Sequence, residues 1–172
     1  MTATTAGALA FTLATGPAMP QLSIGTIDVY VIRPLQPEWR VLVLQRGLGT
    51  RCPTSWETVH GRLEPGEEPE EAAVRELREE TGLTVDRLYN VTVQPFYLHR
   101  SHTVQMAVVF AAFVAEPATV LLGEEHQAHA WLPIAEPLDR FAWPRERAAL
   151  REITEILSTG NAGPVEDVLR VL

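Results

Sequence analysis

The chain contains no lysine, because all 14 of its basic residues are arginine. Without a lysine amine the protein forms no Schiff base, and a Walker-type phosphate loop is excluded as well. Cys52 is the only cysteine, which excludes an internal disulfide and a cysteine-based zinc site. It lies in the turn-like segment RCPTS, and we interpret it as a small loop residue.

Long apolar runs are also missing. No stretch of 18 apolar residues occurs, so we expect no transmembrane span. The first 20 residues are small and apolar, but they lack the basic start and the longer hydrophobic centre of a signal peptide. We therefore expect no secretion signal and, by default, a cytoplasmic location.

The net charge of −8 argues against binding of nucleic acid or of an anionic membrane. An acidic enzyme that acts on a polyphosphate would depend on a bound metal ion and on a few arginines instead. The expected partner is therefore a small molecule. A homodimer is left open.

One run of 23 residues, 61–83, carries the clearest chemical signal: GRLEPGEEPEEAAVRELREETGL. Gly61 is followed after five residues by Glu67, and after seven more by the segment REL-REETGL, residues 75–83. This spacing resembles the Nudix box, G-x5-E-x7-R-E-U-x-E-E-x-G-U with U aliphatic, and every specified position is filled. A chance match in a chain of this length has odds on the order of 10⁻⁷ at average residue usage. The chain therefore resembles the Nudix hydrolases.

The second half of this run predicts a helix. Pro69 suits the first turn, good helix formers follow it, and Gly82 is a helix stop. At about 100° per residue, Glu76, Glu79 and Glu80 fall within an arc of roughly 100°.

The neighbouring positions on this helix predict its orientation. Ala72 and Ala73 lie one turn earlier on the acidic face, where they leave the carboxylates uncrowded. Val74 and Leu77 point to the adjacent side, which we expect to face a core.

Carboxylates at i, i+3 and i+4 repel one another, so they destabilise a bare helix. A divalent cation turns this repulsion into a binding site, and hard oxygen ligands select Mg²⁺, with Mn²⁺ as a substitute. The alternative is a solvated acidic helix face. The glycine, arginine and aliphatic positions at fixed spacing favour the metal site.

The rest of the chain alternates strand and helix patterns without internal repeats. Strands are predicted at 26–34, 40–46, 56–59, 83–98, 103–116 and 129–133, and a second helix at 146–157 that starts near Trp143-Pro144. The expected class is α+β, and the resemblance implies the Nudix fold, an α/β/α sandwich around a mixed sheet. We place the Nudix domain at 24–158, a flexible extension or docking arm at 1–23, and a tail with a short helix at 159–172.

The resemblance also implies roles for the residues of the box. Glu76, Glu79 and Glu80 would ligate the metal ion together with the backbone carbonyl of His60, and Glu79 is also a catalytic candidate. Arg75 would orient Glu76 and pair with Glu67, so we count this pair in the catalytic machinery. Gly61 would allow the loop to approach the helix closely.

A carboxylate outside the box often completes such sites, and Glu125 is the best candidate here, as metal ligand or as base. Dihydroneopterin triphosphate diphosphatases, a Nudix subfamily, carry Glu-His followed five residues later by Trp-Leu. Glu125-His126 and Trp131-Leu132 match that spacing. The alternatives are Glu124 as the active neighbour, or two solvated loop glutamates.

The resemblance implies Mg²⁺-dependent attack of water on a diphosphate bond in a nucleoside triphosphate or a pterin triphosphate. Arg46, Trp143 and Tyr97 are candidates for substrate contact, as are Tyr30 and Phe96, although strand aromatics are more often core residues. Two alternatives remain: a non-catalytic nucleotide-binding sensor, and an enzyme of ADP-ribose or dinucleoside polyphosphates.

Overall fold

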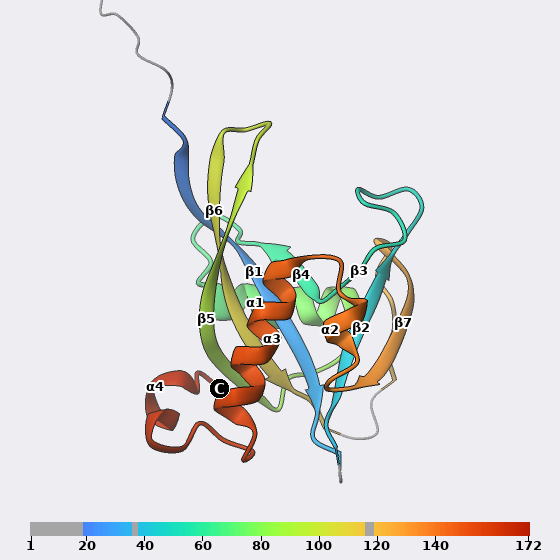
Figure 1. Cartoon of the computed structure of the whole chain (residues 1–172), viewed down its shortest axis with the longest axis vertical. Coiled ribbons are helices and arrows are strands. Elements are labelled where there is room, and N and C mark those ends of the chain that lie inside the picture. Colours follow the sequence, from blue (N-terminus) through green and yellow to red (C-terminus); the bar gives the residue numbers. More distant parts are fainter. Residues whose placement is uncertain (1–18, 36–37, 116–118) are drawn as a thin grey trace, which may run out of the picture.

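A single seven-stranded sheet carries helices on both of its faces (Figure 1). The computed structural model describes residues 19–35, 38–115 and 119–172. The strands are β1 (Gln21–Arg33), β2 (Arg40–Arg46), β3 (Trp56–Glu57), β4 (Val59–Arg62), β5 (Arg87–Leu98), β6 (Thr103–Phe113) and β7 (His126–Pro133). The helices are α1 (Pro69–Thr81), α2 (Pro137–Arg140), α3 (Pro144–Leu157), the short 3-10 helix η1 (Gly163–Val165) and α4 (Glu166–Leu169).

The sheet is mixed, as the sequence predicts. Its order is β3-β2-β1-β6-β5, with β4 paired to β1 and β7 paired to β2. The central β1 and β6 run parallel, and the other pairs are antiparallel. The expected α+β sandwich around a mixed sheet is therefore confirmed.

Alternation along β1 builds two separate cores. Ile27, Val29 and Val31 face α1, whereas Tyr30 and Ile32 face α3. All five are fully buried or nearly so. Successive strand residues point to opposite faces, so one β-branched strand supplies both layers of the sandwich.

The helix α1 lies in a different orientation from the predicted one. Ala72 and Ala73 are fully buried against the sheet together with Leu77, while Val74 is 37% exposed. The expectation that Val74 faces a core was wrong. The two small alanines let the helix pack closely on the sheet, and Glu76 and Glu80, on the same side one and two turns later, are thereby carried toward the sheet's end.

Element ends differ from the predictions in several places. The strand expected from 83 starts at Arg87, and the one expected from 129 starts at His126. The short strand at 56–59 divides into β3 and β4, and α2 was not predicted. The differences lie where turn residues and tertiary pairing, rather than the apolar pattern, set the ends.

The two ends of the chain are attached to the sheet in different ways. β1 begins at Gln21, opposite Thr103 of β6, and residues 1–18 of the expected extension lie outside the described residues. In the tail, the amide of Val171 donates to the carbonyl of Leu88 at 2.9 Å, so the last residues run beside β5. In the described part of the chain no helix is long and apolar enough to span a membrane.

Candidate active site

Glycines on two sides let the backbone come close to the end of α1. A Cβ added at Gly61 would lie 2.2 Å from the carboxyl carbon of Glu76, so a larger residue there would push the Glu76 carboxylate aside. A Cβ added at Gly123 would lie 3.0 Å from the carbonyl oxygen of Glu79. Gly82 ends the helix with φ 69° and donates to the carbonyl of Arg78 at 2.8 Å. The expected close approach at Gly61 and helix stop at Gly82 are confirmed.

Arg75 is the centre of a first charge cluster, on the outer side of α1. Its Nε and Nη2 donate to the two carboxylate oxygens of Glu67 at 2.8 and 2.9 Å. Its Nη1 lies 2.9 Å from Glu76 and 3.3 Å from Glu79. The hydrogen bonds from Arg75 and from the amide of Glu64 lower the pKa of Glu67 to about 2. The predicted Arg75–Glu67 pair is present, and Arg75 also contacts Glu76.

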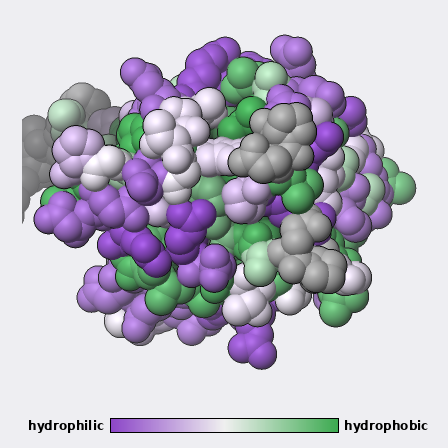
Figure 2. All heavy atoms as spheres, turned by 90° about the horizontal axis from the view of Figure 1, so that it is seen from below, coloured by the Kyte–Doolittle hydropathy of each residue, from purple (hydrophilic) through white to green (hydrophobic). Residues whose placement is uncertain are grey.

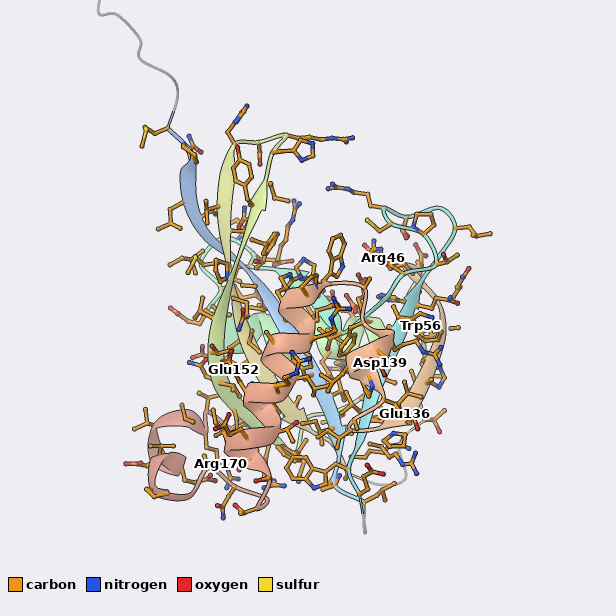
Figure 3. All side chains as sticks on the ribbon, viewed as in Figure 1. Arg46, Trp56, Glu136, Asp139, Glu152 and Arg170 are labelled. Atoms are coloured by element: carbon orange, nitrogen blue, oxygen red, sulfur yellow. The ribbon has the colours of Figure 1, made fainter. Side chains whose placement is uncertain are left out.

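Arg46, labelled at the end of β2 in Figure 3, is the centre of a second cluster, to which β3, the loop before β7 and the first residue of β7 contribute. Its Nη1 donates to Glu57 at 2.7 Å and its Nη2 to Glu125 at 3.0 Å. His126 Nε2 lies 3.2 Å from the same oxygen of Glu57. Burial acts to raise the pKa of Glu57, but the hydrogen bonds of His126 and Arg46 outweigh burial and hold the pKa below its ordinary value.

Glu80 and His126 face each other where the two clusters meet. Glu80 Oε2 and His126 Nδ1 are 3.9 Å apart, and both atoms are buried without a hydrogen-bond partner. Burial raises the pKa of Glu80 well above its ordinary value, and the nearby carboxylates of Glu76, Glu57 and Glu125 raise it further. A buried, unpartnered carboxylate oxygen is costly unless a cation or proton compensates it.

The carboxylates line one small pocket of about 160 Å³. Its walls are Glu76, Glu79 and Glu80 from α1, Gly123, Glu124 and Glu125 from the loop before β7, and His126 at the start of β7. The amide of Gly123 donates to the carbonyl of Glu80 at 3.0 Å, which fixes the loop to the helix end. Helix and loop thus bring together the carboxylates that the sequence proposed from two distant segments.

A divalent cation fits this donor set. The candidate ligands are hard oxygens, as Mg²⁺ and Mn²⁺ prefer, and a cation would compensate the orphaned Glu80 oxygen as a proton does. Within residues 19–35, 38–115 and 119–172, no three His, Cys, Asp or Glu side chains already stand at metal-binding distances. Arg75 explains part of this, because it draws Glu76 and Glu79 toward its own Nη1. The metal roles of Glu76, Glu79, Glu80 and Glu125 stay predictions.

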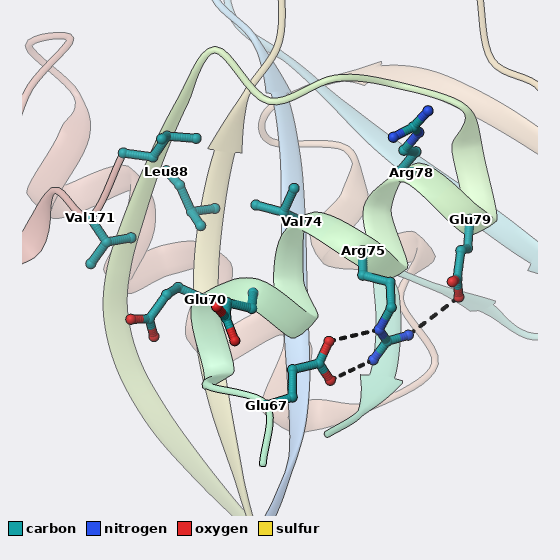
Figure 4. Close-up of a pocket in the computed structure, with 10 residues that line it drawn as sticks. Glu67, Glu70, Val74, Arg75, Arg78, Glu79, Leu88 and Val171 are labelled. Atoms are coloured by element: carbon teal, nitrogen blue, oxygen red, sulfur yellow. Dashed lines mark hydrogen bonds and ion pairs between the residues drawn. The ribbon is translucent and has the colours of Figure 1, made fainter. Parts of the chain in front are cut away.

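A larger groove of about 930 Å³ lies on the outer side of α1 (Figure 4). Its floor is apolar, with Val74, Leu88 and Val171, and the Arg75–Glu67 pair closes one end. Four glutamates line this groove as well, but Arg75 pairs with two of them, Glu67 and Glu79. The smaller pocket is the better candidate for phosphate chemistry, because a buried oxygen of Glu80 lacks a hydrogen-bond partner there.

On the α3 face of the sheet, next to the box, lies a polar cluster that the sequence did not reveal. The buried carboxylate of Asp28 accepts from Arg145 and lies 2.6 Å from His60 Nδ1. The Arg145 guanidinium stacks on Phe96, 4.7 Å from the ring centre. The side chain of His60 is thus engaged with Asp28, and ligation of a metal by its carbonyl stays a prediction.

The predicted substrate contacts are spread over the molecule. Tyr30 is fully buried and donates to the carbonyl of Glu146, so its candidacy was wrong and the core alternative holds. Tyr97 is paired with Val104 on the α1 face, whereas Trp143 is the N-cap of α3 on the other face. Arg46 binds two carboxylates. Substrate contacts of Arg46, Trp143 and Tyr97 stay predictions.

Sequence reasoning also missed Glu57 as the link between Arg46 and His126. Glu57 lies four residues before Gly61, but a single glutamate in a short strand is normally interpreted as solvent-exposed. Glu57 is only 6% exposed because it pairs antiparallel with Leu44, and no local sequence pattern predicts this pairing.

Comparisons with known proteins agree with this geometry. The NUDIX domain model matches residues 26–155. An octanoyltransferase of Myxococcus xanthus is 34% identical over 131 residues, 75% of this chain and 36% of that protein. The asymmetrical bis(5'-nucleosyl)-tetraphosphatase of Mus musculus is 29% identical over 102 residues, 56% of this chain and 68% of that protein.

Among solved structures, a C. elegans Ap4A hydrolase binary complex superposes with a TM-score of 0.65 at 22% identity, over 78% of this chain and 97% of that chain. At this identity the superposition shows the shared fold alone. The chain spans about a third of the octanoyltransferase, so that protein's activity is not carried over from the match. The domain match over 26–155, together with the complete box, shows that the chain belongs to the Nudix family of hydrolases.

Proposed function

We propose that this protein is a Mg²⁺-dependent hydrolase of a diphosphate bond in a nucleoside triphosphate or a pterin triphosphate. The observation that carries the proposal is the single pocket lined by Glu76, Glu79 and Glu80 of α1 and by Glu124 and Glu125 of the opposite loop. A bound cation would neutralise phosphate charge and polarise the attacked phosphorus centre and its water.

Residues of the chain itself would bind the cation, position its ligands and accept the proton of the attacking water. Glu76, Glu79 and Glu80 would hold the cation, and Arg75 would keep Glu76 and Glu79 in place through the contacts at 2.9 and 3.3 Å. Glu125, 63% exposed and held by Arg46, would accept the proton of the attacking water. Glu124 has the same access to the pocket but no such anchor, which favours Glu125 as the base.

The ring end of the substrate would lie on the α3 face of the sheet. There the partly exposed His60 lies next to the Arg145–Phe96 stack, and the buried Asp28 holds both His60 and Arg145 in place. A planar ring with several nitrogen and oxygen atoms suits such a surface. The Glu125-His126 and Trp131-Leu132 spacing supports a pterin, although Trp131 is occupied by Arg33, which stacks 3.9 Å from its ring centre.

A second candidate is a dinucleoside polyphosphate. The mouse relative, named an asymmetrical bis(5'-nucleosyl)-tetraphosphatase, favours it. ADP-ribose belongs to the same set of alternatives, since all of these substrates present a diphosphate beside a ring.

A substrate panel tests the proposal. Nucleoside triphosphates, dihydroneopterin triphosphate, a dinucleoside tetraphosphate and ADP-ribose are incubated with protein and Mg²⁺, and the products are identified by chromatography and mass spectrometry. Pyrophosphate release from a triphosphate supports the leading candidate, and preferred cleavage of the tetraphosphate supports the second. Nucleotide binding without turnover of any compound would overturn both and favour the sensor.

A further inference from the structure

Among the described residues, several strongly exposed apolar side chains gather on a projecting part of the sheet. The hairpin of β5 and β6 and the first residues of β1 extend together beyond the rest of the sheet (Figure 1). In this extension Leu22 is 70% exposed, Ile24 64% and Tyr97 52%. By contrast, hydrophilic and apolar side chains are interspersed at the opposite end of the molecule (Figure 2).

The register shows that these side chains form one continuous stripe. Leu22 pairs with Val104, which pairs with Tyr97. In the next row Ile24 pairs with Met106, which pairs with Pro95. Directly paired residues point to the same face of a sheet, so these six residues share one face.

This face is the one that α1 covers farther along the sheet. Val108, two residues after Met106 on β6, packs with Leu77 of α1 in the core. The extension therefore continues the α1-side core into a stretch that no described element covers. We call the six residues the extension stripe: Leu22, Ile24, Pro95, Tyr97, Val104 and Met106.

The stripe is large enough to form a contact with another protein surface. From the fractional exposures, it presents roughly 500 Å² of apolar accessible surface, at the upper end of the largest patch on ordinary monomers. Two such stripes in contact would remove about 1,000 Å² from water, close to the lower limit of a specific interface.

The charges around the stripe suit a second copy in reversed orientation. The stripe itself carries no charged side chain, so two copies bury no unpaired charge. Arg100 lies at its tip, between β5 and β6. At its base, the amide of Leu63 donates to the carbonyl of Gly25, which places the acidic segment from Glu64 beside the stripe. When two copies pack antiparallel, the Arg100 tip of each approaches the Glu64 base of the other.

We propose that the extension stripe is the contact face of a homodimer, in which two extensions pack face to face and antiparallel about a twofold axis. The two sheets would stack about 10 Å apart, with the apolar side chains interdigitated between them. An interface near the lower size limit is expected to be weak, and we take a dissociation constant on the order of 10 µM for the design of the test.

Sedimentation velocity and light scattering between about 1 and 300 µM protein test the proposal, since this range brackets the expected constant. The full chain should change from monomer to dimer mass over it. Leu22→Glu with Ile24→Glu should leave a monomer at every concentration, and Tyr97→Glu, from another strand, should do the same. Val168→Glu on α4 is the matched control, because Val168 is 72% exposed outside the stripe, and it should dimerise normally.

A charge exchange tests the antiparallel arrangement. Arg100→Glu should weaken the dimer at least several-fold, and adding Glu64→Arg should restore it. A full chain that stays monomeric at the highest concentration overturns the proposal. So does a dimer that persists in the folded Leu22/Ile24 and Tyr97 variants, with folding checked by circular dichroism. If deleting residues 1–18 turns a monomer into a dimer, the face is covered by the chain itself, and the proposal is likewise wrong.

Discussion

Two arginines organise the carboxylates of this protein, and they do so by different means. Arg75 binds Glu67, Glu76 and Glu79, all from the box. Arg46 binds Glu57 and Glu125, which lie 11 and 79 residues away in the chain. The first cluster lies within one continuous segment of the chain, whereas the second forms only when the sheet is complete.

The comparison suggests a division of labour. The Arg75 cluster contacts Glu76 and Glu79, the expected metal ligands, and the Arg46 cluster holds Glu125, the proposed base, on the opposite side. Disturbing the first should therefore affect metal binding and turnover most. Disturbing the second should reduce turnover less while the metal is still bound.

The largest effect is expected on the helix side. Changing Glu79 or Glu80 to Gln removes a charge from the expected metal site, and turnover should fall by roughly 10³-fold or more at saturating Mg²⁺. Steady-state assays with the best substrate of the panel measure this, with circular dichroism as the control for folding. Wild-type turnover in either variant would remove that residue from the site.

The next effect concerns the loop. Glu125→Gln keeps the shape of the side chain but removes its basicity, so turnover should fall by roughly 10²- to 10⁴-fold with substrate affinity largely kept. Glu124→Gln is the matched control and should stay close to wild type. The reverse result would assign the base to Glu124, and two silent variants would place the base within the box.

The local cluster could be predicted from the sequence, and the long-range one only in part. The Arg75–Glu67 pair was expected from the family resemblance and is present. The contact of Arg75 with Glu79, four residues later on the same helix, was not predicted, although helix geometry accounts for it. For Glu125 the sequence offered a family spacing, but not its anchor Arg46, because that contact depends on the β2–β7 pairing. Burial is equally non-local, so the exposure of Val74 and the burial of Tyr30 were misjudged.

A smaller effect on turnover is expected when Glu57, which joins Arg46 and His126 in the second cluster, is changed. Glu57→Gln weakens the contacts of residue 57 with Arg46 and His126. Glu125, which Arg46 holds, and His126, which lies beside Glu80, are then positioned less firmly. We expect a loss of roughly 10- to 100-fold in turnover, as is usual for residues that orient a metal site. Gln127→Ala, exposed in the same region, serves as control. An unchanged rate in the Glu57 variant would show that Arg46 needs no second carboxylate.

The smallest expected effect is on stability in acid. The pKa of Glu67 is lowered from 4.5 to about 2 in the folded protein by Arg75 and the Glu64 amide. The unfolded chain thus binds the proton first, so this stabilisation is complete above about pH 4.5 and is lost as the pH falls toward 2. Melting temperatures should drop less between pH 6 and pH 3 in Glu67→Gln than in the parent. An equal drop in both proteins would show that this pair contributes little.

The most direct test of the carboxylate pocket is binding of the metal itself. Isothermal titration of the protein with Mn²⁺, repeated on the variant in which Glu76, Glu79 and Glu80 are all Gln, measures it without any substrate. Binding in the parent should be abolished in the triple variant, and the rise in melting temperature with Mg²⁺ should vanish with it. Equal Mn²⁺ binding by both proteins would contradict the assignment and place the metal site elsewhere in the chain.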